Sequence, residues 1–348
     1  MKIKLSAALA AAVVLVTANA NAEVEVKTDG GLRVSDDNYS FRVGARIMYD
    51  YNKSELNGVT DEDGFDVRRA RVYISGTVAE DWGFKSQWNV DGDGFEDLYI
   101  RYTGFGSAAR ITIGNQKVPF GLEELQSSKD ISVLERSAIT EQYAVGRSES
   151  VQLDGKLGSN QTYAISAYTQ DEAEDDAKED VGFAARYTIA PINNDSTVVH
   201  LGAAYRDIAD ENAFGLEFGL ATGPFHFQAE YADGDFGDVS ENGYYAQAGY
   251  VITGESRPYS GGVFGRIAPG GNGGAWEAVV RYEDGYGNHS DIELGRTDAS
   301  AFTVGLNYYP HKTVRIGMNY TDGDSNVANE DGSFDDGNEF RIRFQLAF

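Results

Sequence analysis

The nine C-terminal residues, Phe340–Phe348 (FRIRFQLAF), alternate between apolar and polar side chains up to the end of the chain. Strict alternation predicts a β-strand with one apolar face and one polar face. A transmembrane barrel strand has this pattern, because its apolar face meets lipid while its polar face meets water inside. An amphipathic edge strand of a soluble β-sandwich would also alternate, so this segment alone leaves both architectures open.

The N-terminus narrows the choice. Residues 1–4 are basic, residues 5–16 are apolar and Ala20-Asn21-Ala22 is a small-residue cleavage site, which together predict a signal peptide over residues 1–22. The apolar run is too short to cross a bilayer as a helix, which takes about 20 residues, and no later segment approaches that length. A membrane form of the mature chain would therefore be a closed barrel. The chain has no cysteine, so its stability cannot depend on disulfides.

Alternating segments recur along residues 23–348. About sixteen can be counted, an even number as in bacterial single-chain barrels. The six prolines lie outside these segments, as expected because proline cannot donate to a strand ladder. Short connections such as 158–160 alternate with longer acidic ones such as 53–65, the pattern of periplasmic turns and external loops. The predicted fold class is all-β: a transmembrane antiparallel β-barrel of about 16 strands over residues 23–348.

Two connections depart from this pattern. The segment 118–149 is too long for a turn, lacks alternation and contains enough apolar residues to be ordered; loops of this kind are usually functional. We expect it to fold into the lumen and narrow it; the alternative is an outer loop that packs on a neighbouring subunit. The glycine-rich segment 254–274 lies on the short-turn side, so either it hides a further strand pair or it enters the lumen.

The charge distribution bears on what could pass through such a barrel. The formal net charge of −26 argues against an anionic partner for the molecule taken as a whole. Strand parity reverses that inference, because it turns many basic side chains of neighbouring strands inward. The predicted inward cations are Arg42, Arg46, Arg69, Arg71, Lys85, Arg101, Arg110, Arg315, Arg341 and Arg343. A basic stripe in a water-filled lumen favours anions.

Other charged residues limit the inference that the lumen favours anions. Strands on the opposite wall carry inward Glu217, Glu230 and Glu277, while Arg68 has outward parity and is expected near the membrane interface. The inward arginines could also set only a transverse field, without ligand selectivity. In the segment 118–149, we expect the cations to face the basic wall. These cations are Lys129, Arg136 and Arg147.

Several motifs resemble one known family. They include DVRRAR at 66–71, EDLYIRY at 96–102 and IGNQKVPFGLE at 113–123, together with SSKD at 127–130 and TGESRPY at 253–259. The chain resembles the phosphate- and polyphosphate-selective porins O and P over most of its mature length. The resemblance implies a trimeric outer-membrane porin with sixteen strands, an arginine ladder and a lysine-rich constriction. The implied ladder is Arg69, Arg71, Lys85, Arg101 and Arg110, and the implied constriction includes Lys117, Lys129 and Arg136.

The expected function is passive diffusion of anions such as phosphate or polyphosphate through a water-filled channel in the bacterial outer membrane. Guanidinium groups suit phosphate oxygens because they present paired donors and stay charged. The alternative is a general, weakly selective or cation-tolerant porin. The expected partners are inorganic anions, outer-membrane lipid and two further copies of the chain, with no nucleic acid.

An enzyme is not expected. The four histidines lie in no catalytic motif, and no nucleophile, base and orienting group can be assembled from the sequence. No phosphate-cradling loop and no paired-histidine metal spacing is present, so no cofactor is expected.

Overall fold

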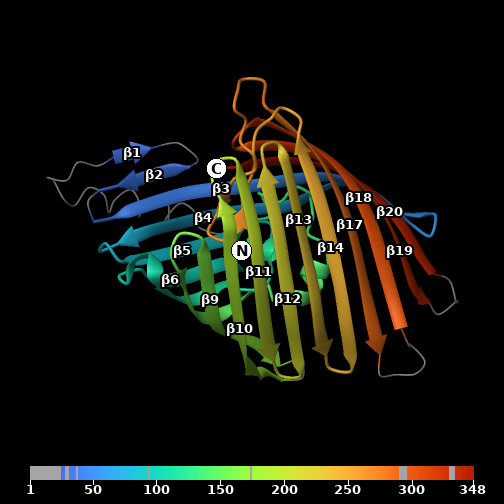
Figure 1. Ribbon diagram of the computed structural model, residues 1–348, viewed down its shortest axis with the longest axis horizontal. Coiled ribbons are helices and arrows are strands. Elements are labelled where there is room, and N and C mark those ends of the chain that lie inside the picture. Colours follow the sequence, from blue (N-terminus) through green and yellow to red (C-terminus); the bar gives the residue numbers. More distant parts are fainter. Residues whose placement is uncertain are drawn as a thin grey trace.

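The computed structural model describes residues 25–27, 31–36, 38–92, 94–172, 175–289, 296–328 and 334–348. The expected signal peptide, residues 1–22, lies outside the described residues. Within the described part, sixteen antiparallel strands pair in chain order and form a closed barrel (Figure 1). The last strand pairs with the first of the sixteen, for example Arg343 with Asp50, and this pairing closes the barrel.

The barrel strands are β3 (Ser40–Leu56), β4 (Val59–Val78), β5 (Trp82–Asn89), β6 (Phe95–Tyr102), β7 (Arg110–Lys117), β8 (Arg147–Lys156), β9 (Gln161–Glu172), β10 (Asp175–Asn193), β11 (Thr197–Ile208), β12 (Glu211–Thr222), β13 (Phe225–Phe236), β14 (Val239–Val251), β17 (Ala275–His289), β18 (Arg296–His311), β19 (Val314–Ala328) and β20 (Phe334–Ala347). Their number and antiparallel pairing confirm the predicted fold class. None of the helices among the described residues is long and apolar enough to cross a membrane.

Side chains alternate between the two faces of each strand, as the period of two requires. On β12, the outward Phe214, Leu216 and Phe218 are exposed, whereas Glu217 between them is buried. Large apolar side chains are exposed in the same way on strands around the barrel. A continuous exposed apolar surface of this kind is stable where lipid covers it.

A short hairpin extends the wall at the end of β3. It consists of β1 (Glu25–Lys27) and β2 (Leu32–Ser35), and Figure 1 shows it beside β3. Strand β2 pairs with residues 40–43 of β3, whereas β20 pairs with β3 only from Arg46 onward. The hairpin therefore covers the part of β3 that β20 does not reach.

The parity expected for Arg68 is wrong. The register between β3 and β4 pairs Met48 with Arg69 and Tyr49 with Val67, which leaves Arg68 as the extra residue of a β-bulge. A bulge places two residues of one strand opposite one residue of its partner, so the alternation is interrupted there. As a result, Arg68 also points into the lumen, where its Nε donates to Glu135 Oε1 (2.7 Å).

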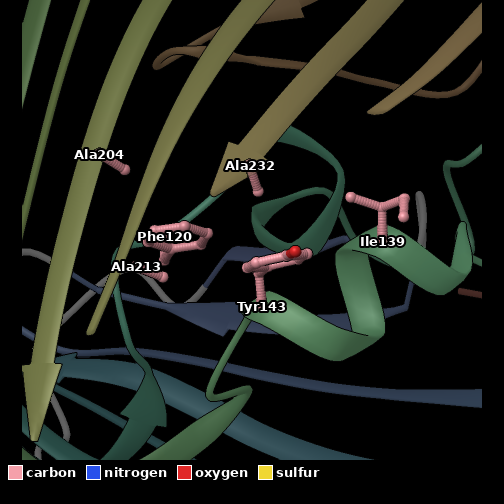
Figure 2. Packing of buried hydrophobic residues seen from close by; sticks show 6 residues of the cluster. All are labelled: Phe120, Ile139, Tyr143, Ala204, Ala213 and Ala232. Atoms are coloured by element: carbon pink, nitrogen blue, oxygen red, sulfur yellow. The ribbon is translucent and has the colours of Figure 1, made fainter. Parts of the chain in front are cut away.

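The segment between β7 and β8 lies inside the barrel and carries the helices α2 (Leu122–Leu125) and α3 (Ala138–Tyr143). Its apolar side chains pack on small residues of the inner wall, as Figure 2 shows. The segment contributes Phe120, Ile139 and Tyr143 to this cluster, and the wall contributes Ala204, Ala213 and Ala232. We call residues 118–146 the inner loop, because β8 already begins at Arg147 rather than after residue 149. The expected inward folding is confirmed.

The glycine-rich segment also enters the lumen, and it does contain a strand pair. We call residues 252–274 the inner turn; it includes the two-residue strands β15 (Tyr259–Ser260) and β16 (Val263–Phe264). Its Phe264 packs in one buried cluster with Leu122 of the inner loop and with Val198 and Ala221 of the wall. Both explanations considered for this segment therefore hold in part.

Candidate functional site

The open part of the lumen contains a cavity of about 350 Å³ beside strands β3–β8. Eight basic side chains and one carboxylate, that of Asp97, are among the described residues that line it. The basic residues are Arg46, Arg69, Arg71, Lys85, Arg101, Lys117, Arg136 and Arg147. Cations in such excess, between walls of low polarisability, produce a positive potential.

A second cavity of about 580 Å³ continues the first toward the C-terminal end of the chain. The two cavities share Arg46, Arg71 and Lys85 in their linings, so they adjoin. The second cavity adds four further cations, and the structure therefore forms one basic path through both. The added cations are Arg42, Lys129, Arg266 and Lys312.

Strand register explains how residues far apart in the sequence meet on this wall. Arg46 of β3 lies directly opposite Arg71 of β4, and Lys85 of β5 lies opposite Tyr99 of β6. Because opposite residues in an antiparallel pair share a face, each inward position brings its partner inward with it. The basic wall thus follows from alternation and register together.

Some of the cavity cations are compensated by carboxylates of β6. Asp97 accepts from Arg147 Nε (2.7 Å) and lies 2.5 Å from Lys85 Nζ, and Glu96 pairs with both Arg71 and Arg147. These pairs hold the long side chains in fixed positions. They also reduce the charge that those cations can offer to a passing ion.

Other cavity cations are not compensated in this way. Arg69 makes no ion pair and no hydrogen bond with the described residues, and its buried Nε has no partner. Arg46 donates only to hydroxyl groups, those of Ser128 (2.7 Å) and Ser127 (2.8 Å), and its Nε is likewise unpartnered. Because neither guanidinium forms an ion pair with the described residues, both can offer their charge and donors to an anion. This part of the wall therefore has the chemistry of an oxyanion site.

The cations that were predicted in the constriction all line one of the two cavities, and two of them also hold the inner loop. Arg136 Nε lies 2.9 Å from Glu124 Oε2, and Lys117 Nζ donates to the carbonyl oxygen of Gln126 (3.0 Å), so both also hold the loop. Lys129 lies 3.1 Å from Asp130 and lines the second cavity. Burial lowers the pKa of Lys129, and the neighbouring Asp130 only partly offsets this effect.

Four residues of the predicted path line neither cavity. Arg110 pairs with Asp154, and Arg341 pairs with Glu135 (2.7 Å). The inner loop covers the other two: Arg315 Nη1 donates to the carbonyl oxygen of Ile131 (2.6 Å), while Arg343 binds Asp50 through two hydrogen bonds and also reaches the carbonyl oxygen of Leu134. Arg315, Arg341 and Arg343 are held in structural contacts because the folded loop lies against their part of the wall, whereas Arg110 is paired within the wall itself.

Sequence reasoning missed two groups of residues. The first is polar and lines the cavity; all of its members except Gln152 lie in the quoted motifs, but no role was assigned to them. The group is Tyr99, Gln116, Ser127, Ser128 and Gln152. The second is a set of buried cations on the opposite wall, which parity would have revealed. Arg186 pairs with Glu217 (2.6 Å), Arg206 donates to the carbonyl oxygen of Tyr143 (2.7 Å), and Arg281 pairs with Glu283 (3.2 Å).

Comparisons of the sequence with known proteins give a consistent result. The sequence profile of the family described as phosphate-selective porin O and P matches residues 41–207 and 206–348. Porin O of Pseudomonas aeruginosa is 28% identical over 410 aligned positions, which cover 92% of each chain. An uncharacterised protein of Caulobacter vibrioides is 24% identical over 84% of this chain and 70% of its own length.

Solved structures show the same fold. An anion-selective porin from Comamonas acidovorans superimposes with a TM-score of 0.62 at 14% identity, covering 89% of this chain and 100% of that one. The outer-membrane channel DcaP of Acinetobacter baumannii gives a TM-score of 0.59 at 13% identity, covering 90% and 99%. At such identities the likeness concerns the architecture of the barrel.

Proposed function

The chain belongs to the phosphate-selective porin O and P family, and from this premise we propose that its basic lumen conducts phosphate and related inorganic anions by passive diffusion. Family and fold make the protein a channel of the bacterial outer membrane. The observation that carries the proposal is that Arg46 and Arg69, in a cavity lined by eight cations and one carboxylate, form no ion pair with the described residues.

The arrangement suits transport better than tight binding. Guanidinium groups and serine hydroxyls donate to phosphate oxygens, and an anion can move from Arg69 and Arg46 to Arg42 along the two adjoining cavities. Several sites of moderate strength let an ion enter and leave quickly. The porin of Comamonas acidovorans, which shares the fold, is described as anion-selective.

Planar-bilayer recording tests this proposal. Chloride current through the wild-type channel is expected to be blocked by added phosphate, and Arg69→Gln is expected to weaken the block roughly ten- to a hundredfold, because a charge-assisted hydrogen bond contributes about 1.5–3 kcal/mol. The matched control is Arg110→Gln, on the same wall but outside both cavities. An unaltered phosphate block in Arg69→Gln would contradict the proposed site.

A weakly selective or cation-tolerant porin is the second candidate. The ion pairs of Arg71, Lys85 and Arg147 with Glu96 and Asp97 favour it, because they reduce the positive charge of the wall. Reversal potentials in a salt gradient distinguish the two candidates. A preference for cations would replace the anion channel with this second function.

We also propose that the channel is a homotrimer without catalytic activity. OmpT of Vibrio cholerae, which shares the fold, has been solved in a trimer form. Two histidines of the lumen, His200 and His226, are buried against Glu217 and Glu277, away from the cavities. The described residues contain no group of histidines and carboxylates able to hold a metal ion. Chemical cross-linking in detergent checks the trimer.

A further inference from the structure

We propose that Arg257, on the inner turn, is a positioning residue that determines where Ser127 and Ser128 lie in the anion path. The inference rests on the proposed function of the basic cavity. It gives the inner turn a specific role. The turn holds the inner loop through one guanidinium group, and the inner loop carries the serines that line the anion path.

Arg257 binds both sides of the segment that carries the two serines. Its Nη2 donates to Gln126 Oε1 (2.9 Å) and to the carbonyl oxygen of Asp130 (3.4 Å). The segment between these two residues is a tight turn, closed by the hydrogen bond from Asp130 N to the carbonyl oxygen of Ser127 (2.7 Å). The guanidinium thus spans the turn from the residue before it to its last residue.

The same turn presents its hydroxyl groups to the cavity. Ser127 and Ser128 line the first cavity, and both accept hydrogen bonds from Arg46. Lys129, at the next position, lines the second cavity. The turn at residues 127–130 is therefore held between Arg257 on one side and Arg46 on the other.

Arg257 is itself fixed by the inner turn. Its side chain is 3% exposed, its Nε donates to the carbonyl oxygen of Gly265 (3.3 Å), and its guanidinium lies 5.4 Å from the centre of the Phe264 ring. Burial lowers the pKa of Arg257, with nearby carboxylates such as Glu277 opposing this effect. Because the Arg257 guanidinium is enclosed in this way, it stays fixed relative to the inner turn and does not move with the inner loop.

The inner turn is in turn fixed to the barrel wall. Arg186 Nη2 donates to the carbonyl oxygen of Gly262 (2.9 Å), and the hydroxyl of Tyr259 lies 2.8 Å from His200 Nδ1. Gln126 has further support, because its Nε2 donates to Gln228 Oε1 on the wall (2.7 Å). The position of the two serines thus depends on a continuous chain of contacts from strands β10 and β11 through the inner turn.

The geometry requires arginine. One planar guanidinium offers several donors in a fixed arrangement, so it can reach a side-chain oxygen and a backbone oxygen while a third donor holds Gly265. Lysine offers a single compact charge on a flexible stem. We therefore expect Arg257→Lys to keep the charge yet to restore only part of the wild-type behaviour.

Two readouts test the role of Arg257. In bilayer recordings, Arg257→Gln is expected to raise the phosphate concentration for half-block of chloride current about tenfold, and Arg257→Lys by less. In a Ser128→Cys background, which has no other cysteine, Arg257→Gln should speed thiol labelling from the lumen at least tenfold, because Ser128 is now only 5% exposed.

The matched control is Arg206→Gln. Arg206 is buried to the same degree and holds the far end of the inner loop through Tyr143, so its loss tests general loosening. We expect labelling and block to change less than twofold in this control. A double-mutant cycle adds a third criterion: with Ser127→Ala and Ser128→Ala present, Arg257→Gln should have little further effect on block.

The outcomes separate this inference from the proposed function. Three outcomes would each overturn the role of Arg257. They are labelling rates and phosphate block in Arg257→Gln equal to those of the wild type, changes in Arg206→Gln as large as those in Arg257→Gln, and additive effects in the double-mutant cycle. A wild-type channel that phosphate does not block would overturn the proposed function instead. The labelling rates would then still decide whether Arg257 positions the turn.

Discussion

At the scale of single residues, Glu135 shows how a carboxylate can anchor a loop in a basic lumen. Its oxygens accept from Arg68 Nε (2.7 Å) and from Arg341 Nη1 (2.7 Å), and Arg343 pairs with it as well. Burial alone would raise the pKa of Glu135, but the hydrogen bond from Arg68 and the charges of Arg343 and Arg68 hold it well below its ordinary value of 4.5. Glu135 is thus a charged tether at neutral pH.

Because the pKa of Glu135 is depressed in the folded channel, its stabilising contribution is fully present above about pH 4.5, declines below that value and is lost as the pH falls through the depressed pKa. We expect steady single-channel current near neutral pH and loop-dependent current noise in acid. Glu135→Gln should show this noise near neutral pH as well, since each charge-assisted hydrogen bond lost costs roughly 1.5–3 kcal/mol. The control is Glu141→Gln, an exposed carboxylate of the same loop. Steady current in Glu135→Gln at every pH would contradict the tether.

At the scale of elements, the inner loop and inner turn fit against strands that present glycine. A Cβ at Gly219 would lie 2.3 Å from the Phe264 ring, one at Gly243 would lie 2.4 Å from Ile139, and one at Gly317 would lie 2.7 Å from Leu134. Gly83, on the open wall, is a contrasting position, since a Cβ there would meet nothing closer than 3.6 Å. Missing side chains on one part of the wall thus create the space that the inserted segments fill.

This difference predicts unequal effects of alanine at Gly317 and at Gly83. Gly317→Ala is expected to destabilise the barrel by about 1–3 kcal/mol through overpacking against Leu134 of the inner loop and Asn307 of the wall. Gly83→Ala should leave stability unchanged or raise it by roughly 0.4–1 kcal/mol, because it lowers the entropy of the unfolded chain. Heat-induced unfolding in detergent, followed by circular dichroism, measures both. Equal losses in the two variants would show that the inserted loop does not use this space.

At the scale of the whole molecule, net charge and cavity charge have opposite signs. The chain carries −26, yet cations dominate both cavities. An ion in the narrow path lies within a few ångströms of the basic wall, whereas acidic external loops act on it through water and salt. Local charge therefore outweighs the overall charge inside the lumen.

We accordingly expect the anion-to-cation permeability ratio to exceed one and to fall with rising salt. Between about 0.1 M and about 1 M, the Debye length shrinks from roughly 10 Å to roughly 3 Å, which screens the wall charge. Reversal potentials across the same relative gradient at several concentrations measure the ratio. Arg69→Gln should lower the ratio at low salt and converge with the wild type at high salt; a ratio independent of salt would contradict an electrostatic origin.

Local alternation along the chain is enough to predict the antiparallel barrel and most of the inward cations, because the period of two along a strand is a property of each segment alone. Which of the inward cations meet open space depends on how the folded chain fills the lumen. Arg69 and Arg343 share the same inward direction, yet Arg69 lines the cavity and Arg343 is covered by Asp50 and the inner loop. That distinction depends on the path of the two inserted segments, which join residues far apart in the sequence. The bulge at Arg68 is likewise invisible to local alternation, because it turns a residue of outward parity into the lumen.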